Sequence, residues 1–137
     1  MYKKNIEAYK KVEKIISSGR ETEARVLTEG AVKLKHCQDN WESENRHSLL
    51  MAALKYNQQI WTIFQTELAK ADNPLAKDVR LNLLRLSAFV DKQIFRTMAY
   101  PSPEKLTPII NVNLGLASGL TKSSAKTSAK TSVTTSG

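Results

Sequence analysis

The sequence predicts an all-α protein: a single small bundle of about five helices, followed by a disordered Ser/Thr/Lys-rich C-terminal tail. Apolar residues recur at helical spacing along most of residues 6–120, and no segment alternates polar and apolar residues as a strand does. The composition changes abruptly at Thr121. Since 137 residues suit one domain, we expect a helical domain at 1–120 and a disordered low-complexity tail at 121–137.

The composition limits the classes of protein to which the chain can belong. Hydrophobic residues make up 41% and charged residues 25% of the chain, as in ordinary globular proteins. No apolar run approaches the roughly 18 residues of a membrane-spanning helix, and the N-terminus lacks a signal-peptide core. The one cysteine, Cys37, excludes an internal disulfide framework. We expect a cytoplasmic protein that does not insert into membranes.

The stretch 49–71 is the helix around which the others should pack. Its apolar face is wide enough to contact neighbours on two sides. The residues of that face recur at the spacing of a helix: Leu50, Ala53, Leu54, Ile60, Trp61, Phe64, Leu68 and Ala71. Asn57 lies in the middle of this face, where an amide needs hydrogen-bond partners.

Four other segments complete the predicted bundle. Residues 6–17 form an amphipathic segment that ends before Gly19. Residues 20–40 form a second helix, in which Gly30 would allow a neighbour to approach closely. Residues 75–98 form a third, bounded by Pro74 and Pro101. Residues 107–119 form a short last helix with Asn113 among its apolar residues.

The tail from Thr121 onward is built from serine, threonine, alanine and lysine. It repeats Ser-Ala-Lys-Thr at 124–127 and 128–131, and its only sizeable apolar residue is Val133. Such a segment cannot bury enough apolar surface to offset the entropy of ordering it. Its three lysines contribute to the net charge of +8, which favours an acidic or nucleic-acid partner only weakly.

Several pieces of the chain together resemble the flagellar biosynthesis regulator FlaF of α-proteobacteria. They are Ala8-Tyr9, Arg20-Glu21-Thr22-Glu23, Ala53-Leu54…Asn57…Trp61…Phe64 and Ile109-Ile110…Asn113…Gly115-Leu116…Gly119-Leu120. The resemblance covers about residues 5–120 and leaves out the tail. It implies a small cytoplasmic helical protein, without catalytic residues, that is needed for flagellin production and export. It also implies flagellin as the partner, and possibly the flagellin translation regulator FlbT.

Two pairs of polar residues are expected to stabilise the fold. Asn57 and Asn113 each sit within an apolar stripe that should point inward, so we expect buried amides that hydrogen-bond to each other or to a free carbonyl. Arg20 and Glu23 both project toward the apolar side of their helix, where a partly buried ion pair would fix the junction with residues 6–17. A polar contact with a partner is the alternative for both pairs.

The helix over 75–98 carries the candidate binding surface. One of its faces, from Leu75 to Ile94, is a complete core stripe. A second, nearly opposite face is also apolar and has basic neighbours. This second face would suit an amphipathic helix of a partner, unless the helix is central and both faces are covered. The candidate binding residues are Leu81, Leu84, Arg85, Ala88, Lys92, Phe95 and Arg96.

Enzymatic and metal-dependent functions find no support in the sequence. His36, Cys37 and His47 match no zinc spacing, and neither a glycine-rich phosphate loop nor a nucleophile elbow is present. We expect no enzyme and no cofactor. The main rival is an RNA-binding post-transcriptional regulator of flagellin mRNA, although aromatic residues are not interleaved with the basic ones as in RNA-binding modules.

Overall fold

The computed structural model describes residues 19–136, with side chains as far as Thr121. The helices of this part are α2 (Arg20–Asp39), α3 (Arg46–Ala69), α4 (Lys77–Ala99) and α5 (Thr107–Ser136), and the short 3₁₀ turn η1 (Pro103–Leu106) leads into α5. The described residues contain no strand, so the all-α prediction is confirmed. They contain four α-helices where about five were expected, and the helix expected over 6–17 lies outside them.

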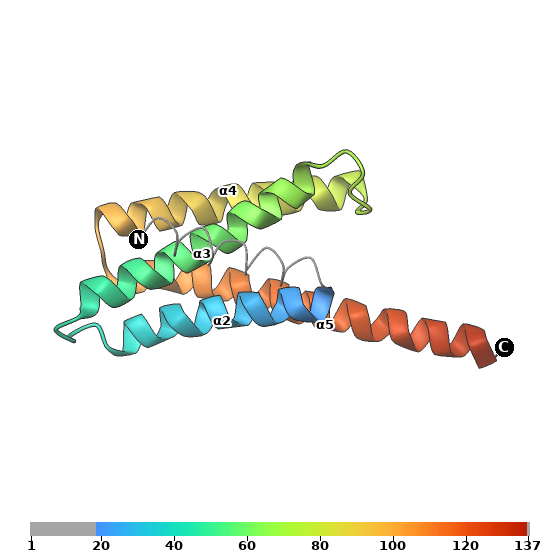
Figure 1. Ribbon diagram of the computed structural model, residues 1–137, viewed down its shortest axis with the longest axis horizontal. Helices are drawn as coiled ribbons and strands as arrows, with labels where there is room; N and C mark the ends of the chain where they lie inside the picture. Colours follow the sequence, from blue (N-terminus) through green and yellow to red (C-terminus); the bar gives the residue numbers. More distant parts are fainter. Residues whose placement is uncertain (1–18, 137) are drawn as a thin grey trace, which may run out of the picture.

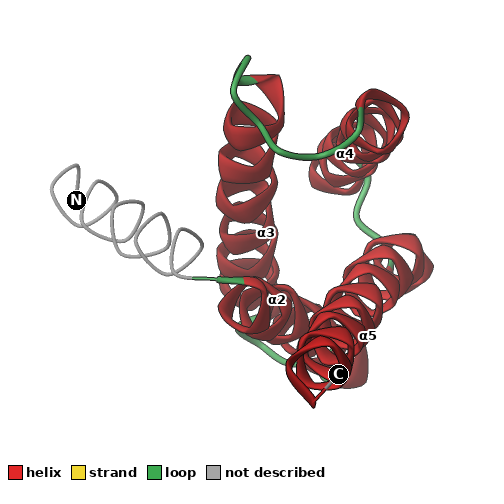
Figure 2. Ribbon diagram, turned by 90° about the vertical axis from the view of Figure 1, so that its right-hand side faces the viewer, coloured by secondary structure: helices red, strands yellow, loops and turns green. Residues whose placement is uncertain are grey.

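The four helices form an open bundle. The helix α2 packs against both α3 and α5, whereas α4 packs against α3 and along part of α5. Within the described residues, the backbones of α2 and α4 do not approach each other closely. Figure 2 shows the consequence: α4 lies at a corner of the bundle, with one side turned away from the other helices.

The core is assembled where α2, α3 and α5 meet. Trp61 is its largest fully buried side chain. The apolar stripe predicted for α3 is buried, except that Phe64 is half-buried and Ala71, beyond the end of the helix, is exposed. The buried apolar residues are Ala24, Val26, Leu27, Ala31, Leu34, Cys37, Leu50, Ala53, Leu54, Ile60, Trp61, Ile63, Leu68, Val90, Ile94, Leu106, Ile109, Ile110 and Ala117.

Short connections hold the helices in place. The helix α3 begins at Arg46, three residues earlier than expected. The Arg46 guanidinium lies 5.2 Å from the centre of the Trp41 ring, a cation–π contact that orders the start of α3. Asn73 organises the next turn, since its Nδ2 donates to the Glu67 carbonyl at 2.9 Å and its Oδ1 accepts from the Leu75 amide at 3.0 Å.

The helix α5 is much longer than predicted. It continues to Ser136, so the backbone is helical over most of the segment for which a disordered tail was expected. Adding a residue to an existing helix avoids the cost of nucleation, and no glycine or proline interrupts the chain between Leu120 and Ser136. In Figure 1 this part of α5 projects beyond the start of α2. None of the described helices combines the length and apolar character needed to cross a membrane.

Candidate partner-binding surface

The second apolar face predicted for α4 is largely open to solvent. On a helix its four residues, Leu81, Leu84, Ala88 and Phe95, fall within an arc of about 60°. Phe95 is 74% exposed and Leu81 is 40% exposed; Ala88 is also exposed, while Leu84 is half-buried. We call these four residues the outer face of α4. Exposure of this face excludes the alternative in which α4 is a central helix covered on both sides.

The opposite side of α4 anchors it to the bundle, and its fully buried residues lie mostly in the second half of the helix. Its buried residues are Ser87, Val90, Ile94 and Thr97. The hydroxyl groups of Ser87 and Thr97 form hydrogen bonds within α4. Ser87 Oγ donates to the Leu84 carbonyl, and Thr97 Oγ1 donates to the Gln93 carbonyl. The predicted core stripe is therefore buried at Val90 and Ile94 and half-buried at Leu83 and Leu86, whereas its early member Val79 is 43% exposed.

Three cations lie along one edge of the outer face. Arg85, Lys92 and Arg96 are all exposed, and we call them the basic row. Among the described residues, the ion pairs are Lys35–Asp39 and Lys70–Glu67, and neither involves the basic row. Arg85 contacts only a neutral amide, at 3.4 Å from Asn82 Oδ1. The outer face is thus an apolar strip beside three positive charges that this part of the protein does not neutralise.

The other edge of the outer face is joined to its surroundings by hydrogen bonds. Asp91 Oδ2 accepts from Gln65 Nε2 at 2.6 Å, which links α4 to α3. Arg80 Nη1 donates to the Lys70 carbonyl at 3.3 Å. The two edges therefore differ: Asp91 and Arg80 are hydrogen-bonded to the bundle on one edge, and three exposed cations line the other.

Phe89 belongs to this surface and was not singled out from the sequence. It is 46% exposed and lies beyond the basic row, so the cations run between Phe89 and the outer face. Its position outside both apolar stripes of α4 is the sequence signal that could have identified it, because neither stripe would bury an aromatic residue there.

The predicted asparagine pair forms a closed polar network in the core. Asn57 and Asn113 are both 0% exposed, and Asn113 Nδ2 donates to Asn57 Oδ1 at 2.7 Å. Trp61 Nε1 can only donate, and it lies 3.0 Å from Asn113 Oδ1, which sets the orientation of that amide. This confirms the predicted burial and hydrogen bonding of both amides.

Backbone carbonyls of α2 and α3 complete the network. Asn57 Nδ2 donates to the carbonyls of Gly30 at 3.1 Å and Ala53 at 2.9 Å. The remaining Asn113 donor reaches the Leu27 carbonyl at 3.1 Å. All four amide hydrogens are used, so the network joins α2, α3 and α5 at a single point and leaves no donor for an outside ligand.

Arg20 and Glu23, the second predicted polar pair, lie in the first turn of α2. Glu23 is half-buried, but Arg20 is exposed, because it is the first residue of α2 and its long side chain reaches solvent at the end of the bundle. Partial burial raises the pKa of Glu23, the charge of Arg20 lowers it, and the nearby carboxylate of Glu67 raises it. The charge of Arg20 thus acts on Glu23, and the predicted junction with residues 6–17 lies outside the described residues.

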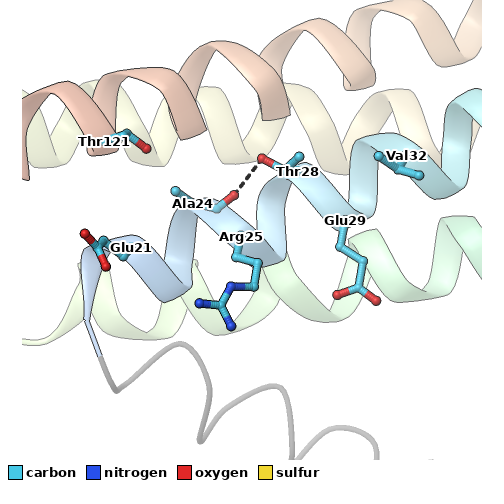
Figure 3. Close-up of a pocket in the computed structure, with 7 residues that line it drawn as sticks. All are labelled: Glu21, Ala24, Arg25, Thr28, Glu29, Val32 and Thr121. Carbon is cyan, nitrogen blue, oxygen red and sulfur yellow. Dashed lines mark hydrogen bonds between the residues drawn. The ribbon is translucent and has the colours of Figure 1, made fainter.

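A shallow groove of about 510 Å³ lies on the surface along the boundary between α2 and α5 (Figure 3). Its hydroxyl groups are turned back onto their own helices: Thr28 Oγ1 donates to the Ala24 carbonyl at 2.8 Å and Thr121 Oγ1 to the Ala117 carbonyl at 3.0 Å. The polar groups that remain to orient a ligand are the charged side chains of Glu21, Arg25 and Glu29. Its lining residues are Glu21, Ala24, Arg25, Thr28, Glu29, Val32 and Thr121, none of which was predicted to bind a partner.

The metal-binding and redox-active side chains are dispersed. The described residues contain no cluster of three or more His, Cys, Asp or Glu side chains that could hold a metal ion. Cys37 is buried in the core, and burial raises the pKa of its thiol, which lowers its reactivity. The described side chains combine an exposed apolar strip with a basic edge on α4 and a closed polar network in the core.

Comparison with known proteins agrees with the resemblance seen in the sequence. The comparisons with curated proteins and with solved structures each gave no match. A family model described as "Flagellar protein FlaF" matches residues 5–120, which include the asparagine network and the whole of α4. The chain belongs to the FlaF family of flagellar proteins.

Proposed function

We propose that this protein of flagellum biogenesis binds flagellin in the cytoplasm through the outer face of α4, as a non-enzymatic chaperone that regulates flagellin synthesis and export. The observation that carries the proposal is the exposure of an apolar strip on a helix that already has a separate buried side. An exposed apolar strip of this kind, bordered by charge, is typical of a binding surface for an amphipathic helix.

The partner supplies a physical reason for such a chaperone. Flagellins have helical termini whose apolar faces become buried only on polymerisation. A cytoplasmic subunit therefore exposes apolar surface before export. Covering that surface with the outer face would bury apolar area on both proteins and prevent premature assembly.

Purified flagellin provides the direct test. Phe95 is the expected anchor, because it is the largest side chain of the outer face, it is 74% exposed, and aromatic residues dominate the energetics of interfaces. Phe95→Ala should weaken flagellin binding by about 2 kcal/mol, or about thirtyfold in Kd, measured by isothermal titration calorimetry.

Val32→Ala is the matched control. Val32 is 59% exposed, but it lies on α2, whose backbone does not approach α4 closely. Loss of affinity in the Val32 variant and not in the Phe95 variant would move the site to the groove between α2 and α5. Equal affinity of both variants and the unchanged protein would contradict the proposed use of α4.

A further inference from the structure

The basic row makes the outer face of α4 asymmetric, and this asymmetry limits which helices fit it. Arg85, Lys92 and Arg96 all lie on one edge, and the described part of the chain supplies no acidic partner for any of them. The opposite edge is tied to α3 and its loop through Asp91 and Arg80. A helix that lies on the outer face therefore meets three exposed cations on one side, and on the other side Asp91 and Arg80, which are hydrogen-bonded to α3 and its loop.

The spacing within the basic row is as informative as its charge. Lys92 follows Arg85 by seven residues and Arg96 follows Lys92 by four, which places the three residues about 10.5 Å and about 6 Å apart along the axis. A helix packed at a small crossing angle has the same rise per residue. Its acidic residues would match the row only with the same two spacings.

From this geometry we infer that the outer face recognises an amphipathic helix with three acidic residues on one edge, spaced seven and four residues apart. The inference rests on the proposed function, since it specifies the flagellin segment that the outer face takes. Either order of the spacings places the three carboxylates within an arc of about 40° on the partner helix. The order of the two spacings depends on the direction of the partner helix. A spacing of seven and then four residues fits a parallel helix, and four and then seven fits an antiparallel one.

The apolar residues on both sides of the basic row should strengthen these contacts. Phe95 and Phe89 flank the cations, and both rings are exposed in the free protein. A bound helix would bring them against its own apolar residues and exclude water from the ion pairs between them. Ion pairs that are partly desolvated gain more electrostatic energy than pairs in open solvent, and complementary charge also fixes register.

Three designed peptides of identical composition test the inference. Each is a helix with the same leucine stripe. In the first peptide three glutamates follow the seven-then-four spacing on one edge, in the second they follow four-then-seven, and in the third they lie on the side opposite the leucines. One of the first two peptides should bind the full-length protein at least about tenfold more tightly than the third, measured by fluorescence anisotropy.

Reversing the charge of Lys92 tests whether the basic row causes the preference between peptides. Lys92→Glu should remove the tenfold preference, and replacing the middle glutamate of the preferred peptide by lysine should restore it. Lys55→Glu is the control, because Lys55 is an exposed cation on α3 and its reversal changes the net charge by the same amount. Equal binding of all three peptides, or equal losses with Lys92→Glu and Lys55→Glu, would overturn the inference.

Parallel measurements separate this inference from the proposed function. If Phe95→Ala weakens flagellin binding while the three peptides bind equally, the proposed function stands and the spacing rule is wrong. If the peptides are discriminated but flagellin does not bind, the surface serves a different acidic helix and the proposed function is wrong. If vesicles containing anionic lipid bind the protein and Lys92→Glu abolishes that binding without any peptide preference, the row serves a membrane surface and the inference falls.

Discussion

Gly30 is the residue at which the core network closes. Its carbonyl accepts a hydrogen bond from Asn57, and its missing side chain leaves room for the two amides beside it. A Cβ at this position would lie 2.5 Å from Asn57 Oδ1 and 2.9 Å from Asn113 Nδ2. The glycine therefore matters for close approach, since its backbone has ordinary helical geometry.

Gly30→Ala should consequently destabilise the protein by about 2 kcal/mol or more, because the amides must shift and break buried hydrogen bonds. Gly115→Ala is the control, since Gly115 is exposed in α5 and a Cβ there would meet no atom within 4 Å. Alanine favours a helix over glycine, so that variant should gain up to about 1 kcal/mol. Urea unfolding measures both changes. Equal stabilities of the two variants would show that the network tolerates a methyl group.

Glu23 should make stability depend on pH in the opposite direction from most carboxylates. Its folded-state pKa is raised above 4.5, mainly by burial, so the folded protein holds the proton more tightly than the unfolded chain does. The contribution of this group to stability is greatest below pH 4.5 and is lost as the pH rises through the folded pKa.

Glu23→Gln should therefore raise stability at pH 7 relative to the unchanged protein and narrow the difference at pH 4. Denaturant midpoints measured across that range check the sign. Glu21→Gln serves as the control, because Glu21 is exposed in the same helical turn. A Glu23 variant that is less stable at pH 7 would mean that its interaction with Arg20 outweighs burial.

At the scale of elements, α4 shows most clearly what sequence reasoning can and cannot reach. Its two apolar faces were visible in the pattern, and so was the basic edge. Which face is buried depends on α4 packing closely against α3 and α5 but not against α2, and helical periodicity carries no information about that arrangement. The early start of α3 was missed for a related reason, because Arg46, His47 and Ser48 are polar and add nothing to an apolar pattern.

Two adjacent residues of α4 test this assignment of faces. Ile94 is 1% exposed, and Ile94→Ala should cost about 2–5 kcal/mol by leaving a cavity. Phe95→Ala should change stability by less than about 0.5 kcal/mol, although it deletes the larger side chain, because Phe95 is 74% exposed. Thermal and urea unfolding of the two variants provide the comparison. A large loss with Phe95→Ala would mean that the ring packs within the protein.

At the scale of the whole molecule, α5 has two parts with different roles. Its first part carries Ile109, Asn113 and Ala117 into the core. Its continuation has a composition that predicts disorder, and the backbone is nevertheless helical as it projects past α2 (Figure 1). The asparagines in the middle of the apolar stripes could be identified from the sequence, because a polar side chain among buried apolar residues conflicts with the pattern and needs hydrogen-bond partners. Continuation of a polar helix involves no such conflict, so the apolar pattern gives no sign of it.

Ending the chain after Thr121 should leave the fold intact. The last core residue of α5 is Ala117, and Thr121 already bonds back to it. We expect the melting temperature to change by less than about 4 °C, which corresponds to roughly 1 kcal/mol for a domain of this size. A larger drop, measured by circular dichroism, would show that the continuation of α5 packs against the bundle.

The response to salt separates flagellin binding from RNA binding in the intact protein. The net charge of +8 attracts either partner, but the two complexes depend on charge to different degrees. A helix bound to the outer face is held mainly by apolar burial, so raising the salt from about 50 to about 200 mM should weaken it only a few-fold, through the ion pairs of the basic row. An RNA held by three phosphate contacts on the same row would lose about twentyfold, since each contact releases a counterion. Anisotropy titrations of flagellin and of a flagellin mRNA fragment over this range make the comparison. If flagellin fails to bind at every salt concentration while RNA binding falls steeply, the protein acts on flagellin mRNA and the cations of α4 bind phosphate.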